Sequence, residues 1–234
     1  MKILYEGKAK IVYEIEGEHK KYIIFFKDTA TAFDATKSAK IEGKGVLNNT
    51  ISSLLFELLE KNGIKTHFVQ KISDREMLVW KAERFDLEVV VRNITAGSIC
   101  KRLGLKEGER LKKPIVEFFY KNDKLHDPLI CIDHALLLGI ADKKALKDTV
   151  KIALKVNTIL KRFFESHGLL LVDFKLEFGR LVDGTLAVID EISPDTCRLW
   201  DAKTGEKLDK DRFRFDLGDL IEGYKKVLEK VQGG

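Results

Sequence analysis

A row of alternating charged side chains lies within one of the most apolar stretches of the chain. Between residues 171 and 178, Asp173, Lys175 and Glu177 alternate with valine, phenylalanine and leucine residues. Because successive side chains of a β-strand point to opposite faces, this spacing puts the three charges on one face. Spacing alone fits a solvated outer face and a binding site equally well. The rarity of an Asp-x-Lys-x-Glu pattern inside so apolar a run favours the site.

A further carboxylate is predicted to lie opposite this row. Asp183 and Gly184 between two apolar runs indicate a hairpin with a two-residue loop, and that register places Glu177 directly opposite Asp190. Two carboxylates opposed across an antiparallel pair repel each other unless a cation neutralises them. Mg²⁺ takes one or two carboxylates and completes its shell with water and phosphate oxygens. Glu177 and Asp190 therefore predict a magnesium site of the kind that binds a nucleoside triphosphate.

Two further segments could bind phosphate. Gly7-Lys8-Ala9-Lys10 lies between two predicted strands, where backbone N–H groups and ammonium groups could meet phosphate oxygens, although a basic surface turn explains the tetrapeptide alone. The chain has neither a Walker A loop nor a G-x-G-x-x-G motif. Arg92 ends an apolar run just before Gly97 and Ser98, a natural receptor for phosphate or carboxylate. The competing interpretation is an arginine that pairs with a core carboxylate.

Two more segments are rich in charge. Residues 190–201 form a predicted loop that contains Pro194 and Arg198, and binding residues concentrate in loops on rigid scaffolds. Residues 209–214 read Asp-Lys-Asp-Arg-Phe-Arg, which is usually a solvated charged run.

The elements that must position these residues follow from apolar periodicity. The predicted strands are residues 2–5, 10–16, 20–27, 66–72, 76–82 and 87–94, followed by the hairpin after residue 168. The predicted helices are residues 45–62, 97–103, 141–167 and 216–231. Residues 28–44 are predicted to be a polar loop, and the polar break at residues 81–86 is taken as a lobe boundary. Strands first and mainly helices later indicate an α+β fold with two lobes rather than a doubly wound sheet.

The composition excludes several classes of protein. The chain has 234 residues, of which 44% are hydrophobic and 34% charged, with a formal net charge of +5. These values exclude a disordered, collagenous or coiled-coil protein. No stretch approaches the roughly 20 apolar residues of a membrane span, and a cytosolic protein is expected. Three widely spaced cysteines predict reduced thiols. A nucleic-acid-binding module is the rival class, but the basic residues are interleaved with acidic ones throughout.

These motifs together resemble the SAICAR synthetase family over nearly the whole chain. The matching segments are Gly7-Lys8-Ala9-Lys10, Val90-Val91-Arg92-Asn93 with Ala96-Gly97-Ser98, Lys121-Asn122-Asp123 with His126-Asp127-Pro128, residues 171–179, Asp190-Glu191 with Ser193-Pro194-Asp195, Arg198-Leu199-Trp200-Asp201, and residues 209–214. Several separate motifs in one order make a chance match implausible.

The resemblance implies a reaction and an architecture. The expected enzyme is an ATP-dependent ligase that joins the carboxylate of carboxyaminoimidazole ribonucleotide (CAIR) to the amine of L-aspartate. The products would be SAICAR, ADP and phosphate, formed through an acyl phosphate. The implied fold is related to protein kinases and ATP-grasp enzymes. Its antiparallel β-rich N-terminal lobe (residues 1–83) and larger α+β C-terminal lobe (residues 84–234) would hold ATP between them. A small-molecule kinase on the same scaffold is the alternative.

The resemblance also implies roles for individual residues, and no nucleic-acid or membrane partner. Nucleotide contacts are expected from Lys8, Ala9, Lys10 and Lys121, and Mg²⁺ ligands from Glu177 and Asp190. The expected substrate-binding residues are Asp34, Arg92, Ser98, Asp127, Asp173, Lys175, Arg198 and Arg214, of which Arg92, Ser98 and Arg198 would receive the ribotide phosphate. Lys175, Asp173 and Lys10 are the expected catalytic residues, with Lys175 stabilising charge on the transferring group. A homodimer is expected.

Overall fold

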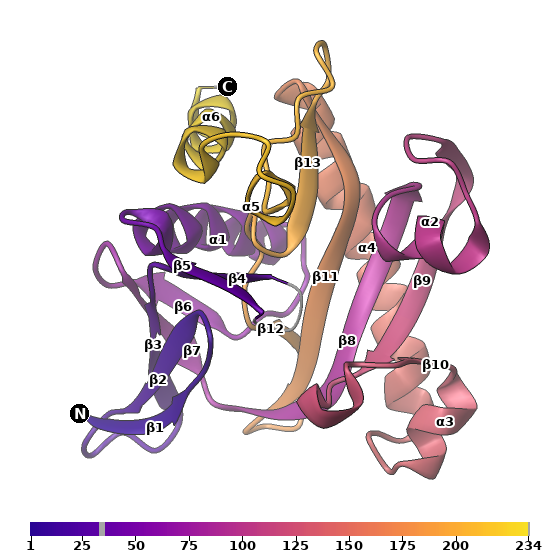
Figure 1. Cartoon of the computed structure of the whole chain (residues 1–234). Coiled ribbons are helices and arrows are strands. Elements are labelled where there is room, and N and C mark those ends of the chain that lie inside the picture. Colours follow the sequence, from indigo (N-terminus) through magenta and orange to yellow (C-terminus); the bar gives the residue numbers. More distant parts are fainter. Residues whose placement is uncertain (33–35, 234) are drawn as a thin grey trace.

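The computed structural model describes residues 1–32 and 36–233, which form an α+β fold (Figure 1). The strands are β1 (Lys2–Glu6), β2 (Lys10–Glu14), β3 (Lys21–Phe26), β4 (Thr29–Ala32), β5 (Lys37–Lys40), β6 (Phe68–Lys71), β7 (Glu76–Trp80), β8 (Ala82–Ile94), β9 (Arg110–Tyr120), β10 (Leu129–Ile130), β11 (Leu169–Leu181), β12 (Leu186–Ile189) and β13 (Cys197–Asp201). The helices are α1 (Lys44–Lys61), α2 (Ser98–Leu103), α3 (Ile132–Leu137), α4 (Lys143–Ser166), α5 (Asp211–Arg214) and α6 (Leu220–Gln232), with a 3₁₀ turn η1 (Asp123–Leu125). The α+β prediction is confirmed.

The first sheet is antiparallel, in the order β1-β2-β3-β7-β6 among the described residues. Helix α1 packs against β3, β6 and β7. Its apolar residues Ile51, Leu55 and Leu59 are fully buried, as their helical spacing predicts. Residues 28–44 are not simply the polar loop that the sequence predicts, because β4 and β5 within them pair as a short hairpin. Small and polar residues such as those of β4 and β5 give little apolar signal for a strand.

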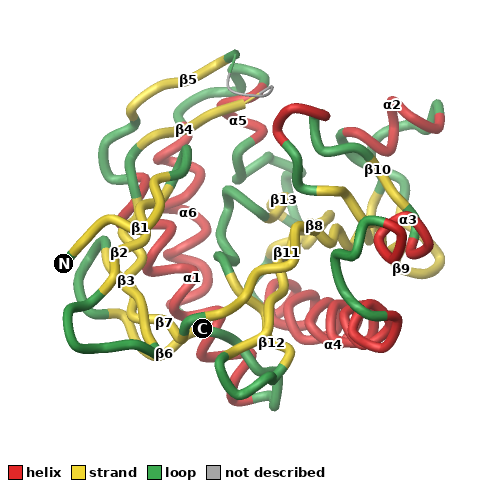
Figure 2. The backbone as a smooth tube through the Cα atoms, turned by 90° about the horizontal axis from the view of Figure 1, so that it is seen from below, coloured by secondary structure: helices red, strands yellow, loops and turns green. Residues whose placement is uncertain are grey.

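The second sheet has the order β10-β9-β8-β11-β12, and β13 pairs with β11 as well. Helix α4 contacts β8, β9 and β11 and covers one face of this sheet, as Figure 2 shows. Phe174, Leu176 and Phe178 of β11 belong to the main hydrophobic core, together with residues of α4. From Asp173 to Phe178 the alternation is therefore as predicted, with the apolar face in the core and the charged face on the side away from α4. Val172 does not share that apolar face, because the register shifts between Leu171 and Asp173 and Val172 lies in a separate cluster with Leu170.

The hairpin between β11 and β12 has a different register from the one predicted. Glu177 lies opposite Ile189, not Asp190, because the loop has three residues (182–184) rather than two. Leu181 and Thr185 flank the loop, and Gly184 takes the left-handed conformation with φ 82°. A two-residue type I′ turn would need a positive φ at the preceding aspartate as well, and only the glycine adopts one. The predicted direct opposition of Glu177 and Asp190 is therefore wrong.

Two other boundaries differ from the predictions. The predicted polar break at residues 81–86 is mostly strand, because β8 begins at Ala82 and its first residues pair with the end of β11. Lys81 alone separates β7 of the first sheet from β8 of the second. The last helix begins at Leu220 instead of residue 216, since Asp219 caps it by accepting bonds from the backbone N–H groups of Ile221 and Glu222.

The C-terminal helix returns to the first part of the chain. Helix α6 packs beside α1, and both views show the two helices together (Figures 1 and 2). Tyr224 and Leu220 of α6 form a small buried cluster with Leu47 of α1 and Ala30 of β4. Segments from the N-terminal and the C-terminal parts of the chain therefore both help to build the region around α1.

No helix in the described part of the chain is long and apolar enough to cross a membrane.

Candidate active site

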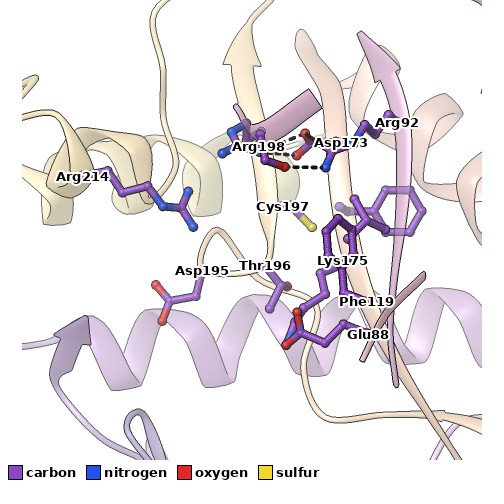
Figure 3. A pocket seen from close by; sticks show the side chains of 13 residues that line it. Glu88, Arg92, Phe119, Asp173, Lys175, Asp195, Thr196, Cys197, Arg198 and Arg214 are labelled. Atoms are coloured by element: carbon purple, nitrogen blue, oxygen red, sulfur yellow. Dashed lines mark hydrogen bonds and ion pairs between the residues drawn. The ribbon is translucent and has the colours of Figure 1, made fainter. Parts of the chain in front are cut away.

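A cavity of about 230 Å³ opens on the face of β8 and β11 that is turned away from α4 (Figure 3). Its lining residues are Glu88, Val90, Arg92, Ser98, Phe119, Asp173, Phe174, Lys175, Asp195, Thr196, Cys197, Arg198 and Arg214. Six residues predicted from the sequence to bind substrate are among them. The charged row of β11 is not a solvated face, since Asp173 and Glu177 are each only 3% exposed.

Lys175 lies among three carboxylates. Its Nζ is 2.8 Å from Glu177 Oε1, 3.0 Å from Glu88 Oε1 and 3.7 Å from Asp190 Oδ2. Burial would lower the pKa of Lys175, but Glu177, Glu88 and Asp190 outweigh it and raise that pKa well above its usual value. Lys175 is therefore a fixed positive charge at neutral pH and cannot serve there as a base. Glu177 and Asp190 converge on this ammonium although they do not oppose each other in the hairpin.

Glu88 lines the cavity but belongs to none of the motifs that indicated the other residues of the site. It lies on β8 directly opposite Glu177 of β11, and Lys121 lies 2.6 Å from Glu177 Oε1 and 3.5 Å from Glu88 Oε1. Burial would raise the pKa of Glu88, but Lys175 and Lys121 together lower it. Glu88 and Arg92 are both polar at even spacing in an apolar run, and this pattern could have identified Glu88.

Lys10 connects the first sheet to the loop after β12. Its ammonium pairs with Asp190 and lies 2.9 Å from Glu191 Oε1. Burial would raise the pKa of Asp190, but Lys10, Lys175 and Lys121 lower it below its usual range. Asp190 has a φ of 74°, so the chain leaves the regular strand geometry at this residue. The cluster of Lys10, Lys121, Lys175, Glu88, Glu177, Asp190 and Glu191 is called the central charge cluster below.

The loop at residues 7–10 lies beside the central charge cluster. The carbonyl of Ala9 accepts a bond of 2.8 Å from the N–H of Lys27, and Gly7 N–H donates to Lys10 O. Lys8 reaches across to Asp123 of η1 at 3.0 Å. The predicted nucleotide residues Lys8, Ala9, Lys10 and Lys121 are therefore near one another, and Lys8 and Lys10 are tied to later parts of the chain.

The lining of the cavity does not test the predicted substrate roles of Asp127 and Asp34. Asp127 does not line it, and its Oδ1 accepts a bond of 2.7 Å from the N–H of Asn122 in the same loop. Asp34 lies outside the described residues. Their predicted roles stay predictions.

Arg92 is buried among partners at the other end of the cavity. Its Nη1 is 2.7 Å from Asp173 Oδ2, its Nε is 2.6 Å from Glu117 Oε2, and Nη2 donates to Ser98 Oγ at 3.1 Å. The side chain of Arg92 is only 3% exposed. Of the two interpretations of Arg92, the structure therefore shows the one in which it pairs with buried carboxylates. Ser98 Oγ accepts a second bond of 2.8 Å, from Arg102. Because both bonds are accepted, the hydroxyl proton of Ser98 can donate to a ligand.

Arg198 and Arg214 are the more accessible arginines of the cavity, with side chains 16% and 27% exposed. Arg198 Nη1 lies 2.9 Å from Asp173 Oδ2, and Asp211 joins the two arginines by accepting from Arg198 Nε at 2.9 Å and from Arg214 Nη1 at 2.7 Å. Figure 3 shows Asp173 between Arg198 and Arg92. Gly97 has a φ of 62° and a ψ of −129°, a backbone conformation that favours glycine, and a Cβ there would lie 2.5 Å from Arg198 Nη2. Burial would lower the pKa of Arg198, but the carboxylates of Asp173 and Asp211 outweigh it and raise that pKa.

The charged run of residues 209–214 is buried, not solvated. Asp209 and Asp211 are 0% and 1% exposed, and Arg212 is 6% exposed. Asp209 accepts bonds from the N–H groups of Leu199 and Asp211, while burial, together with the charge of Asp211, raises the pKa of Asp209 to about 7. The expectation of a solvated run is wrong, because these carboxylates fix β13 and the arginines of the cavity.

The central charge cluster and the arginines of the cavity have the charges that an enzyme site for anionic substrates would need. A family model described as SAICAR synthetase matches residues 3–231. The chain is 61% identical over 229 residues to the phosphoribosylaminoimidazole-succinocarboxamide synthase of Persephonella marina, covering 98% of this chain and 95% of the relative. It is 64% identical over 203 residues to the protein of that name from Aquifex aeolicus, covering 87% and 94%.

A solved structure of a SAICAR synthetase in complex with ADP matches with a TM-score of 0.95 at 54% identity, covering 98% of this chain and 97% of the other. The chain belongs to the SAICAR synthetase family. It is accordingly an enzyme, a ligase of purine biosynthesis.

Proposed function

We propose that this enzyme joins the carboxylate of CAIR to the amine of L-aspartate at the expense of ATP, giving SAICAR, ADP and phosphate. Family membership supports the overall reaction. The observation in the structure that carries the proposal is that the central charge cluster lies next to the arginine-lined cavity, with Lys175 belonging to both. The central charge cluster suits a nucleotide and its metal ion, and the arginine-lined cavity beside it suits a phosphorylated substrate.

The central charge cluster fits ATP with Mg²⁺. Glu177 and Asp190 each lie within 4 Å of Lys175 Nζ, so their oxygens converge on one place. Among the described residues no group of three or more acidic, histidine or cysteine side chains is arranged to hold a metal. Mg²⁺ does not require such a group, because it takes one or two carboxylates and completes its shell with water and phosphate. Glu177 and Asp190 would hold the ion, and the bound ion would neutralise phosphate charge.

The lysines around these carboxylates would bind the phosphates themselves. Lys10 and Lys121 approach the carboxylates from the first sheet and from the end of β9, and Lys8 lies in the loop beside them. We propose that Lys8, Ala9, Lys10 and Lys121 contact ATP, as the resemblance to the family implies. When a nucleotide binds, the ammonium groups would exchange some of their carboxylate partners for phosphate oxygens.

The arginine-lined cavity fits the ribotide. Arg198 and Arg214 are accessible enough to bind a phosphate directly, and the free proton of Ser98 would donate to it. Arg92 and Asp173 would act from beneath, with Arg92 adding positive charge and Asp173 holding both Arg92 and Arg198 in place. A phosphate at this end would direct the carboxylate of CAIR toward Lys175.

The chemistry then follows from the position of Lys175. A carboxylate is a poor acyl donor because an oxide is a poor leaving group. The carboxylate oxygen of CAIR would attack the γ-phosphorus of ATP, release ADP and form an acyl phosphate. The aspartate amine would attack the acyl carbon and lose a proton, and phosphate would leave with the oxygen that came from CAIR. Lys175, a permanent cation, would stabilise the negative charge that develops on the transferring phosphoryl group.

A small-molecule kinase on this scaffold is the alternative, and the family match does not favour it. An assay of ADP release separates the two. CAIR and L-aspartate are supplied to the enzyme with ATP and Mg²⁺, first separately and then together. Sustained release of ADP is expected only when both are present. Sustained release with CAIR and no aspartate would identify a kinase.

We also propose an assembly and an organisation that the resemblance supports. The enzyme is proposed to be a cytoplasmic homodimer with no nucleic-acid or membrane partner. The lobes are proposed as residues 1–83 and 84–234, with the change from the first sheet to the second at Lys81 near this boundary. Light scattering after size-exclusion chromatography tests the dimer, for which a mass of about 53 kDa is expected from twice the chain mass of 26.7 kDa.

A further inference from the structure

We propose that Lys44 and Tyr224 are positioning residues, which hold the loop of residues 190–196 in the active site by fixing both carboxylate oxygens of Asp195. This inference rests on the proposed function. It concerns two residues that do not line the cavity and that come from α1 and α6, two helices far apart in the sequence.

Asp195 is held from two sides. Lys44, in the first turn of α1, places Nζ 2.5 Å from Asp195 Oδ2. Tyr224 of α6 donates its hydroxyl to Asp195 Oδ1, also at 2.5 Å. Lys44 is 1% exposed and Tyr224 is fully buried, so water does not compete for these bonds. A carboxylate with both oxygens fixed by separate helices has little freedom to move.

The electrostatics explain why this contact is strong. Burial would raise the pKa of Asp195, but the charges of Lys44 and Lys210 and the bonds from Lys44 and Tyr224 lower it below its usual range. Asp195 is therefore a buried carboxylate whose charge depends on its partners. If the ammonium of Lys44 is removed, the loop must either move or keep an insufficiently paired charge in the interior.

The loop that Asp195 belongs to joins the two halves of the active site. At its beginning Glu191 pairs with Lys10, and Ser193 Oγ donates to Glu191 Oε2 at 2.6 Å. At its end the carbonyl of Thr196 accepts a bond of 2.8 Å from the N–H of Lys175. Asp195 and Thr196 also line the cavity, as Figure 3 shows for both. A displacement of Asp195 would therefore move the cavity wall and the backbone contact of Lys175.

The end of α1 that carries Lys44 is itself firmly fixed. Asp28 accepts a bond of 3.0 Å from the N–H of Gly45 and forms a two-pronged ion pair with Arg75. A Cβ at Gly45 would lie 2.3 Å from the carbonyl oxygen of Phe26, so the helix end lies directly against the end of β3. Lys44 is thus presented to Asp195 from a rigid base, as a positioning residue requires.

The test compares Lys44→Met and Tyr224→Phe with the wild type and with Lys61→Met. Lys61 is an exposed lysine at the other end of the same helix and serves as the matched control. Assays run well below the thermal unfolding midpoint of each variant. For Lys44→Met, kcat/KM for CAIR is expected to fall by about 10²-fold, because small displacements in a site are costly. For Tyr224→Phe a loss of about tenfold is expected, since one bond to a charged group is removed.

The pattern of constants distinguishes positioning from general destabilisation. Positioning predicts a raised KM for CAIR and a lowered kcat, with the KM for ATP within about twofold of wild type. Partial unfolding would lower kcat and leave both KM values unchanged, and that result would overturn the inference. So would wild-type constants in both variants, or an equal rise in both KM values. If Lys44→Met does not fold, the same criteria apply to Tyr224→Phe. Wild-type enzyme that forms no SAICAR would instead refute the proposed function.

Discussion

Replacing Lys175 with methionine tests the electrostatic account of the active site. The substitution keeps a similar side-chain length and removes a positive charge that lies 2.8, 3.0 and 3.7 Å from oxygens of Glu177, Glu88 and Asp190. Breaking a buried ion pair costs about 3–5 kcal/mol of stability, and the lower end applies because the side chain of Lys175 is 23% exposed. We therefore expect the free energy of unfolding to fall by about 3 kcal/mol.

The same substitution should have a larger effect on catalysis than on folding. Removal of one group that stabilises transition-state charge typically lowers kcat by about 10²–10³-fold. Because the pKa of Lys175 is raised, the wild-type residue stays charged from pH 6 to 9, and the loss should be the same across this range. Steady-state kinetics with CAIR, aspartate and ATP measure kcat, and urea denaturation measures stability.

Lys151→Met is the control for both measurements. Lys151 is 72% exposed and pairs with Asp148 on the surface of α4, so its loss should change stability by less than about 1 kcal/mol and leave kcat unchanged. Lys175→Met with kcat within tenfold of wild type would refute the reasoning, because the carboxylates and the transferring group would then not depend on this ammonium.

Three further predictions concern other parts of the site. Glu177→Gln and Asp190→Asn should each abolish turnover of Mg²⁺·ATP, while the circular dichroism spectrum stays that of the wild type. Near-normal activity in either variant would contradict the assignment of these residues as metal ligands. Arg92→Ala removes one of the two arginines that pair with Asp173 and leaves the pair with Arg198. Urea denaturation should therefore show a free energy of unfolding lower by about 3 kcal/mol, and steady-state kinetics should show a raised KM for CAIR. An equal rise in the KM for ATP would contradict a role on the ribotide side. Burial lowers the pKa of His67 to about 4, below the value of about 6.5 expected in the unfolded chain. As the pH drops from 6.5 to 4, protons therefore bind the unfolded state first, and the free energy of unfolding falls by up to about 3 kcal/mol. In urea denaturation the stability of His67→Phe should decline less steeply over this pH range, and an unchanged slope would contradict this origin.

Apolar periodicity predicted most of the fold. Strands β1, β2 and β3, the helices α1 and α4 and the alternating face of β11 all follow from the spacing of their apolar residues. The hairpin register did not, because Asp183-Gly184 fits loops of two or three residues and the difference depends on the backbone angle of one aspartate. Strands β4 and β5 were missed since their residues are mainly small or polar. Strand β9 was not predicted, and β13 lies within residues 190–201, which were predicted to be a loop.

The site residues were predictable where a motif marked them and not where only the fold joins them. Arg198 was identified from its motif, but its partner Asp211 was assigned to a run expected to be solvated, since no local pattern reveals that α5 folds back against β13. Glu88 reaches the site because β8 pairs with β11, where it lies opposite Glu177, a residue 89 positions later in the sequence. Lys44 resembles any lysine in the first turn of a helix until Asp195 is placed beside it.

The route of one oxygen atom tests the central claim most directly. CAIR labelled with ¹⁸O in both carboxylate oxygens is converted with ATP, Mg²⁺ and L-aspartate, and the products are analysed by mass spectrometry. Ligation through an acyl phosphate predicts one ¹⁸O atom in the released phosphate and one in the new amide of SAICAR for each turnover. Unlabelled phosphate, or ADP formed without SAICAR, would contradict the account.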